Sequence, residues 1–102
     1  MSIQKQYLKS RPVCKVTFRL PEELGQRARK ASIAGEFNGW SLSAHPMKRQ
    51  KNGSFLATLD LEAGREYQFR YVLDEEVWEN DPEADRFVPT PFGTGHNGVL
   101  VT

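Results

Sequence analysis

The chain has 102 residues and a mass of 11.6 kDa, a length that predicts one small domain. It contains no segment near the roughly 20 apolar residues of a membrane span and no apolar signal-peptide core. Its one cysteine, Cys14, excludes an internal disulfide, so we expect a cytoplasmic protein that contacts no membrane. Residues 1–51 carry 11 Lys and Arg against 3 Asp and Glu, whereas residues 52–102 carry 3 against 10. Pairing between these halves weakens, without excluding, the hypothesis of a basic nucleic-acid surface.

The first third of the chain predicts an arm, a strand and a short helical turn. Residues 1–11 are polar and basic without a period, and we expect a flexible arm ahead of a domain over residues 12–102. Residues 13–20 alternate apolar and polar side chains, which is typical of a half-buried strand. Pro21 and two acids follow as at a helix start, but Gly25 interrupts them, which predicts a loop holding one helical turn.

A second predicted strand ends in a tight turn. The apolar run 31–34 leads to Asn38 and Gly39, which both tolerate positive φ values. Phe37 is the last side chain of this segment that can enter a core. Trp40 emerges just beyond the turn, where packing alone does not account for a large flat ring. We interpret Phe37 as structural and Trp40 as a surface recognition residue.

A hairpin and an aromatic strand follow. Asn52 and Gly53 predict a type I′ turn between a short edge strand and a strand over residues 55–61. Residues 67–73 place Tyr and Phe side chains on one face and Arg70 on the other.

The last third contains short strands joined by polar loops. The connection 74–76 lacks glycine, which disfavours a two-residue primed turn and predicts a longer loop before a strand at 77–79. Residues 86–88 and 99–101 are further strand candidates. About seven short strands with frequent turns predict an all-β, antiparallel β-sandwich with almost no helix.

Several apparent motifs fail on their context. Residues 93–98 read G-T-G-H-N-G, but only four residues remain where a dinucleotide-binding helix would have to start. Residues 81–85 resemble the start of a calcium loop, but Arg86 stands where glycine is required. His45 and His96 have no cysteine or histidine at ligand spacing, so we interpret both as loop residues. No nucleophile motif is present either, and the sequence predicts neither catalysis nor a metal or cofactor.

An aromatic and polar set remains after these exclusions: Trp40, Arg70, Trp78 and Asn97. Arg70 lies on the strand face opposite the aromatic side chains, and Trp78 is flanked by acids, so both are expected at the surface. A pyranose ring presents C–H groups on its faces and hydroxyls at its rim. Indole rings supply a flat apolar platform for such a ligand, and Arg and Asn supply hydrogen bonds.

The order and spacing of six segments resemble a known family. The segments are E-F-N-G-W, P-M, N-G-S-F, L-E-A-G, Y-Q-F-R-Y and W-E-N-D-P, and the resemblance extends over residues 13–102. They resemble the glycogen-binding, isoamylase N-terminal-like modules (carbohydrate-binding module family 48), which include the β subunit of AMP-activated protein kinase and the N-terminal domains of branching and debranching enzymes. The resemblance implies an immunoglobulin-like early-set sandwich that binds α-1,4-linked glucans without catalysis.

The resemblance also implies a set of ligand-binding residues. It places the stacking tryptophans at Trp40 and Trp78, the basic contact at Arg70, and a binding loop at Phe92, Thr94 and Asn97. Two loops beside this site depart from the family pattern, since the connection before Trp78 and the final loop at residues 95–96 are each one residue longer.

Two alternatives to glucan binding stay open. The chain could be a structural or docking domain that serves a glucan-processing enzyme, of the glycoside hydrolase family 13 type, or another protein, without binding sugar itself. It could also be a small β domain that binds single-stranded nucleic acid through aromatic side chains and a basic groove. The favoured partner is an α-glucan oligo- or polysaccharide, with no nucleic acid.

Overall fold

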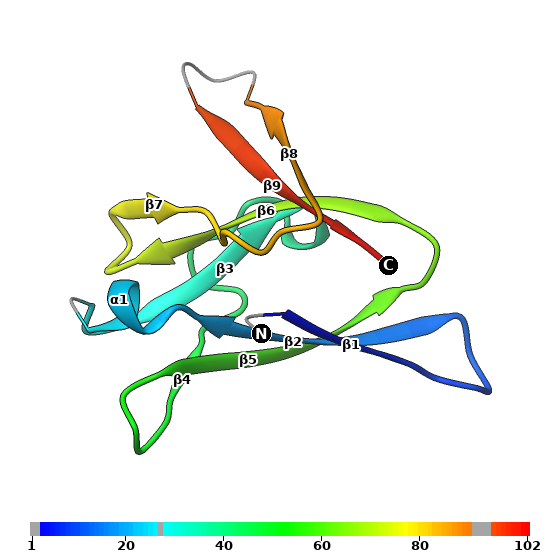
Figure 1. Ribbon diagram of the computed structural model, residues 1–102, viewed down its shortest axis with the longest axis horizontal. Coiled ribbons are helices and arrows are strands. Elements are labelled where there is room, and N and C mark those ends of the chain that lie inside the picture. The colour runs from blue at the N-terminus through cyan, green and yellow to red at the C-terminus, as the bar shows by residue number, and fades with distance from the viewer. Residues whose placement is uncertain (1–2, 27, 91–94) are drawn as a thin grey trace.

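A computed structural model describes residues 3–26, 28–90 and 95–102, which form two antiparallel β-sheets packed face to face (Figure 1). The elements in chain order are β1 (Ile3–Tyr7), β2 (Val13–Leu20), α1 (Glu22–Gly25), β3 (Ala31–Gly35), the 3-10 helix η1 (Glu36–Asn38), β4 (Lys48–Arg49), β5 (Phe55–Glu62), β6 (Glu66–Leu73), β7 (Val77–Glu79), β8 (Arg86–Pro89) and β9 (His96–Val101). The first sheet has the order β1-β2-β5-β4, and the second has the order β3-β6-β9-β8 with β7 paired to β6. The predicted antiparallel β-sandwich is confirmed, with nine strands in the described residues where the sequence predicts about seven. No helix in this part of the chain has the length and apolar character needed to cross a membrane.

The extra strand at the N-terminus replaces part of the predicted flexible arm. Ile3–Tyr7 pair antiparallel with β2, from Ile3 opposite Phe18 to Tyr7 opposite Cys14. The polar composition of residues 1–11 hides this strand, because its stabilisation comes from the backbone ladder along β2 and from the burial of Ile3. Residues 3–7 are therefore an edge strand of the first sheet.

The core lies between the sheets and follows the predicted alternation. Cys14, Val16, Phe18 and Leu20 of β2 are fully buried while the residues between them are not. The Phe18 ring meets the Phe69 ring of β6 edge-on, with 5.3 Å between their centroids. The apolar faces of β2 and β5 in the first sheet thus pack against that of β6 in the second, as the alternation of their residues predicts.

The open edges of both sheets are covered by specific contacts. Beyond β3, the segment 45–47 continues the pairing, since the Ile33 N–H donates to the His45 carbonyl at 3.1 Å and the Met47 N–H donates to the Ala31 carbonyl at 2.8 Å. On the opposite side, the inward-pointing Lys5 of edge strand β1 places its Nζ 2.7 Å from a carboxylate oxygen of Asp85. An inward charge of this kind protects a free strand edge from pairing with another chain.

Two connecting turns differ from their predictions. The hairpin between β4 and β5 is present, but Gly53 has a positive φ (89°) and Asn52 does not, so the turn is not the predicted type I′. Asn52 instead uses its side-chain oxygen to accept the Ser54 N–H at 3.0 Å. After β6, Asp74 and Glu75 both have positive φ (51° and 62°), the primed geometry that the absence of glycine argued against. The connection is nevertheless longer than two residues, as predicted, since Leu73 pairs with Val77.

Candidate functional site

The two tryptophans of the chain lie side by side on the outer face of the second sheet. The centroids of the Trp40 and Trp78 rings are 6.3 Å apart, and their planes are tilted by 47°. Trp78 is 40% exposed and Trp40 is half-buried. In β7, Trp78 stands opposite Val72, which points away from the aromatic core face of β6. The pair therefore forms an accessible, bent aromatic surface.

The turn after β3 brings Trp40 to this surface. The backbone leaves η1 through two left-handed residues, Gly39 at φ 66° and Trp40 at φ 60°, and the Trp40 N–H donates to the Gly35 carbonyl at 2.9 Å. The sequence predicts positive φ at Asn38 and Gly39, so the left-handed pair lies one residue further along than expected. Asn38 holds the turn through its side chain instead, accepting the Gly35 N–H at 3.1 Å and the Ser41 N–H at 3.2 Å.

Gly35 allows the chain to turn this close to β6. A β-carbon at this position would lie 2.6 Å from the Gln68 carbonyl oxygen and 2.9 Å from the Phe37 ring. Both distances are shorter than van der Waals contact allows, so a larger residue would displace η1, and with it Trp40.

Arg70 is held next to the tryptophans by the last strand. On β6 it precedes Val72 by two residues and therefore shares the outer face with Trp78. Its Nε donates to Asn97 Oδ1 at 2.8 Å, and its Nη2 donates to the His96 carbonyl at 2.6 Å. The planar guanidinium has five N–H donors, and these two bonds orient it while leaving others for a ligand.

Asn97 is buried and orients Arg70, and it is not itself an exposed part of the site. Its side chain is buried, and its Nδ2 donates to Gln68 Oε1 at 3.0 Å while its oxygen receives Arg70. Arg70, Asn97 and Gln68 thus form one hydrogen-bonded row across the outer face of β6 and β9.

Asn80 lies at the point where the pairing partner of β6 changes from β9 to β7. Phe69 of β6 pairs with Gly98 of β9, whereas Tyr71 pairs with Glu79 of β7. Between these points the Asn80 Nδ2 donates to the His96 carbonyl at 2.7 Å, and its oxygen accepts the Gly98 N–H at 3.1 Å. Sequence reasoning missed Asn80 and Gln68. The available signal was their spacing, two residues after Trp78 and two before Arg70.

A buried hydrogen bond fixes the segment that follows Trp78. The Tyr71 hydroxyl donates to Asp81 Oδ2 at 2.6 Å, and Asp81, fully buried, also accepts the Glu83 N–H at 2.8 Å. Burial and the adjacent Asp81 carboxylate raise the pKa of Tyr71 far above its usual range. The sequence suggests that the acids of 81–85 are solvated or paired with the basic half. Asp85 does pair with Lys5, but Asp81 is an internal anchor.

The structure brings together four of the six predicted site residues. Trp40 and Trp78 contact each other, and Arg70 and Asn97 are hydrogen-bonded on the same sheet face. Phe92 and Thr94 lie outside the described residues. The assembled surface offers two apolar planes beside a fixed guanidinium, an arrangement that suits a flat ligand with an apolar face and oxygen atoms at its rim.

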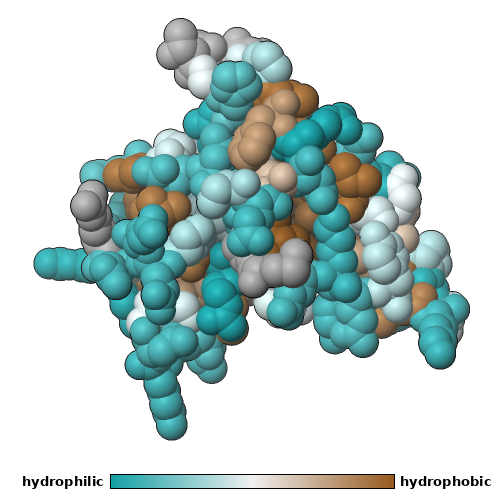
Figure 2. Space-filling model, in the orientation of Figure 1, coloured by the Kyte–Doolittle hydropathy of each residue, from teal (hydrophilic) through white to brown (hydrophobic). Residues whose placement is uncertain are grey.

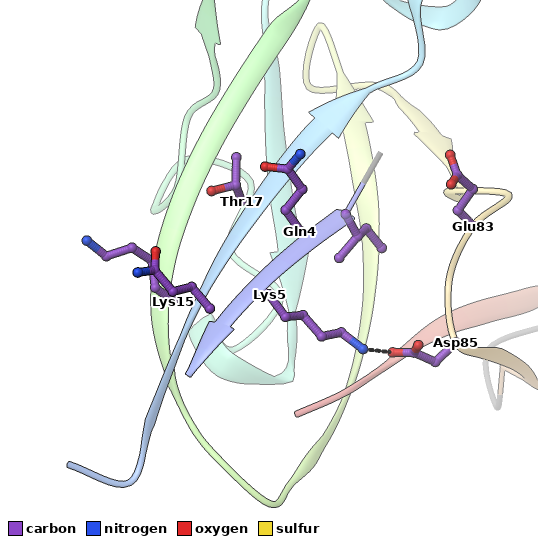
Figure 3. A pocket seen from close by; sticks show the side chains of 8 residues that line it. Gln4, Lys5, Lys15, Thr17, Glu83 and Asp85 are labelled. Carbon is purple, nitrogen blue, oxygen red and sulfur yellow. Dashed lines mark hydrogen bonds and ion pairs between the residues drawn. The ribbon is translucent and has the colours of Figure 1, made fainter. Parts of the chain in front are cut away.

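The rest of the visible surface differs from this site. Figure 2 shows a largely hydrophilic face on which hydrophobic residues gather over β7 and β8. A hollow of about 550 Å³ lies away from the tryptophans, between β1 and the loop before β8 (Figure 3). Its lining contains Gln4, Lys5, Lys15 and Glu83 and no aromatic side chain. It lacks the stacking surface that distinguishes the tryptophan site.

Comparison with known proteins adds one finding. A family model described as the glycogen recognition site of AMP-activated protein kinase matches residues 23–102, more than three quarters of the chain. The matched range contains all six residues predicted for the site, and it excludes β1 and β2. No individual curated protein matches the chain.

Proposed function

The chain belongs to the family of the glycogen recognition site of AMP-activated protein kinase, and we propose that it binds α-1,4-linked glucans such as glycogen, starch and maltooligosaccharides without a catalytic step of its own. The observation that carries this proposal is the pair of tryptophan rings with centroids 6.3 Å apart, Trp78 exposed and Trp40 half-buried. Each indole plane stacks on the C–H face of a glucose unit. The 47° tilt between the planes suits a chain that curves from one unit to the next.

Arg70 supplies the polar part of the site. Its guanidinium is oriented by Asn97 and by the His96 carbonyl, and its remaining N–H groups donate to sugar hydroxyls at the rim of the stacked ring. Phe92 and Thr94 enter the proposal through the family resemblance alone, as further contacts to the sugar, whereas Asn97 of β9 contributes by orienting Arg70. A shallow open site of this kind predicts dissociation constants of about micromolar to millimolar, roughly 4–8 kcal/mol.

The test is a titration of the protein with maltoheptaose. The chain contains only two tryptophans, and both lie in the proposed site, so fluorescence excited selectively from tryptophan reports on that site alone. We expect a saturable change in the wild type. We also expect Trp40→Ala and Trp78→Ala, measured by calorimetry, each to weaken binding at least about tenfold, equivalent to about 1.4 kcal/mol.

A control variant separates loss of stacking from loss of fold. Tyr7→Ala removes a 54% exposed aromatic ring from β1 in the opposite sheet, and it is expected to bind maltoheptaose as the wild type does. Circular dichroism of each variant establishes that it is folded. A folded wild type that shows no response up to millimolar sugar would refute glucan binding and favour the docking-domain alternative.

A further inference from the structure

The amide of Asn38 organises the turn that presents Trp40. Its Oδ1 accepts two backbone N–H groups, from Gly35 at 3.1 Å and from Ser41 at 3.2 Å. Its Nδ2 donates to the Ile33 carbonyl at 2.9 Å. The accepted N–H groups lie on either side of Trp40 in the chain, so the same side chain holds both ends of the segment that contains the left-handed Trp40.

These backbone partners determine the chemical state of His45. Two N–H donors face Oδ1 and one carbonyl faces Nδ2, so the amide of Asn38 has only one orientation that satisfies all three. The second hydrogen of Nδ2 then points at His45 Nδ1, which is 2.8 Å away. Nδ1 must therefore accept, and the neutral ring carries its proton on Nε2.

We propose that His45 is a positioning residue for glucan binding, whose neutral imidazole stabilises the Asn38 turn and thereby the orientation of Trp40. This inference rests on the proposed function. When His45 is protonated, Nδ1–H faces the N–H of Asn38, and two donors oppose each other. Rotating the Asn38 amide would relieve that contact, but it would turn Nδ2 toward the N–H groups of Gly35 and Ser41. Either way the turn loses hydrogen bonds, and Trp40 loses its fixed place beside Trp78.

Of the charged groups on the neighbouring elements, Glu36 and Arg49 are engaged in other contacts and Lys48 is exposed. Glu36 of η1 accepts the Gln68 N–H at 2.7 Å. Arg49 of β4 donates to the Ala28 carbonyl at 2.6 Å and lies 4.5 Å over the Phe55 ring, and Lys48 of β4 is exposed.

One aromatic ring packs against the imidazole, and a second packs behind it. Phe37 meets the His45 ring edge-on at 5.9 Å, and the Tyr67 ring meets Phe37 at the same distance. The imidazole thus lies against the Phe37 ring and the Asn38 amide.

The test compares maltoheptaose affinity at about pH 8 and about pH 5.5, the range in which histidine side chains titrate. We expect wild-type affinity to be about three- to tenfold weaker at the lower pH, the effect of one lost hydrogen bond. In His45→Asn the amide Oδ1 is bonded to Cγ, as Nδ1 is in histidine, and can accept the same hydrogen bond. The amide does not gain a proton in this range, so the affinity of this variant for maltoheptaose should not change with pH. His45→Leu removes the acceptor and should bind weakly at both values.

The second histidine provides the matched control. His96 is exposed, and its contact with Arg70 is made by the backbone carbonyl, so His96→Gln should retain the wild-type ratio of affinities between the two pH values. A ratio that disappears in His96→Gln but persists in His45→Asn would overturn the inference. So would a wild type that binds equally well at both pH values, a result that leaves the proposed function intact.

A readout without sugar keeps the inference separate from the proposed function. In nitrogen-15 NMR, Nδ1 of His45 should be unprotonated and Nε2 protonated at about pH 8. The indole N–H signal of Trp40 should shift on acidification in the wild type but not in His45→Asn. If maltoheptaose fails to bind at any pH, the proposed function fails. The NMR titration then decides the coupling of His45 to Trp40, and an unmoved Trp40 signal refutes it.

Discussion

Trp40, which is proposed to stack on the ligand, has a strained backbone conformation. Its φ of 60° lies in the left-handed region, which costs a bulky L-residue about 1–2 kcal/mol. The surrounding turn offsets this cost through the Trp40 N–H bond to Gly35 and the three backbone contacts of Asn38. A ring held in this way loses little conformational freedom when a ligand stacks on it.

Tyr71 allows a prediction at the same scale. Tyr71→Phe removes the hydroxyl that donates to the buried Asp81 at 2.6 Å, and we expect the free energy of unfolding to fall by about 1–3 kcal/mol. In the unfolded chain tyrosine ionises near pH 10, roughly its reference value. Because the pKa of Tyr71 is raised in the folded protein, the stabilisation is complete below that pH and is lost as the pH rises above it. Urea denaturation at neutral and alkaline pH measures both effects.

Tyr67→Phe is the matched control for this experiment. The Tyr67 hydroxyl reaches the Glu62 carbonyl only at 3.5 Å, in an exposed position, so its removal should cost little at any pH. Equal losses in the two variants, or an alkaline decline that persists unchanged in Tyr71→Phe, would contradict the assigned role of the buried pair.

At the scale of the elements, the turn between β6 and β7 is held by a neighbouring loop. Asp74 and Glu75 have positive φ without being glycine. The Asp74 carboxylate accepts the N–H groups of Arg29 at 2.9 Å and Lys30 at 3.0 Å, and these bonds hold its pKa below the usual range. A lowered pKa means that the carboxylate stabilises the fold at neutral pH and that this contribution disappears as acid protonates it. The bonds to the loop before β3 compensate for the absent glycine.

This turn predicts a stabilising substitution. Glycine adopts positive φ without a steric penalty, so Glu75→Gly should raise the free energy of unfolding by up to about 1 kcal/mol. Loss of the exposed Lys30–Glu75 ion pair removes only part of that gain, because surface pairs contribute little. Thermal unfolding measures the change. Glu76→Gly, at the next residue without positive φ, should destabilise, and the reverse order of the two variants would argue against strain in the turn.

At the scale of the whole molecule, ion pairs join the basic first half of the chain to the acidic second half. Lys5 pairs with Asp85 and Lys30 with Glu75, with nitrogen–oxygen distances of 2.7 and 2.8 Å. These contacts confirm the predicted pairing between the halves. The further pairs Arg65–Glu62 and Arg86–Glu66 lie within the second half.

Ionic strength distinguishes the proposed neutral ligand from a nucleic acid. A glucan carries no charge, so its affinity should change less than about twofold between about 0.05 and about 0.5 M salt, whereas phosphate contacts weaken steeply over that range. Parallel titrations with maltoheptaose and a single-stranded oligonucleotide measure the difference. Tighter binding of the oligonucleotide at low salt, lost at high salt, would support the nucleic-acid alternative.

The sandwich and most of its strands could be predicted from the sequence, because a period of two in residues 13–20, 55–61 and 67–73 is stabilised by burying the apolar face of each strand. The sequence also singled out Trp40 and Trp78, since large flat rings beside turns and acids are unusual for packing alone. Alternation and exposed aromatic residues are local features, so they can be recognised within a single stretch of the sequence.

Features that depend on a partner distant in sequence are visible only in the folded protein. Edge strand β1 exists because the backbone of β2 offers a ladder, and Asp74 and Glu75 turn without glycine because a loop more than forty residues earlier donates to Asp74. Asn80 and Gln68 organise Arg70 through bonds to β9, and His45 meets Asn38 across a folded turn. Hydrogen bonds between such distant groups leave no periodic trace in the sequence, so composition and spacing could not predict them.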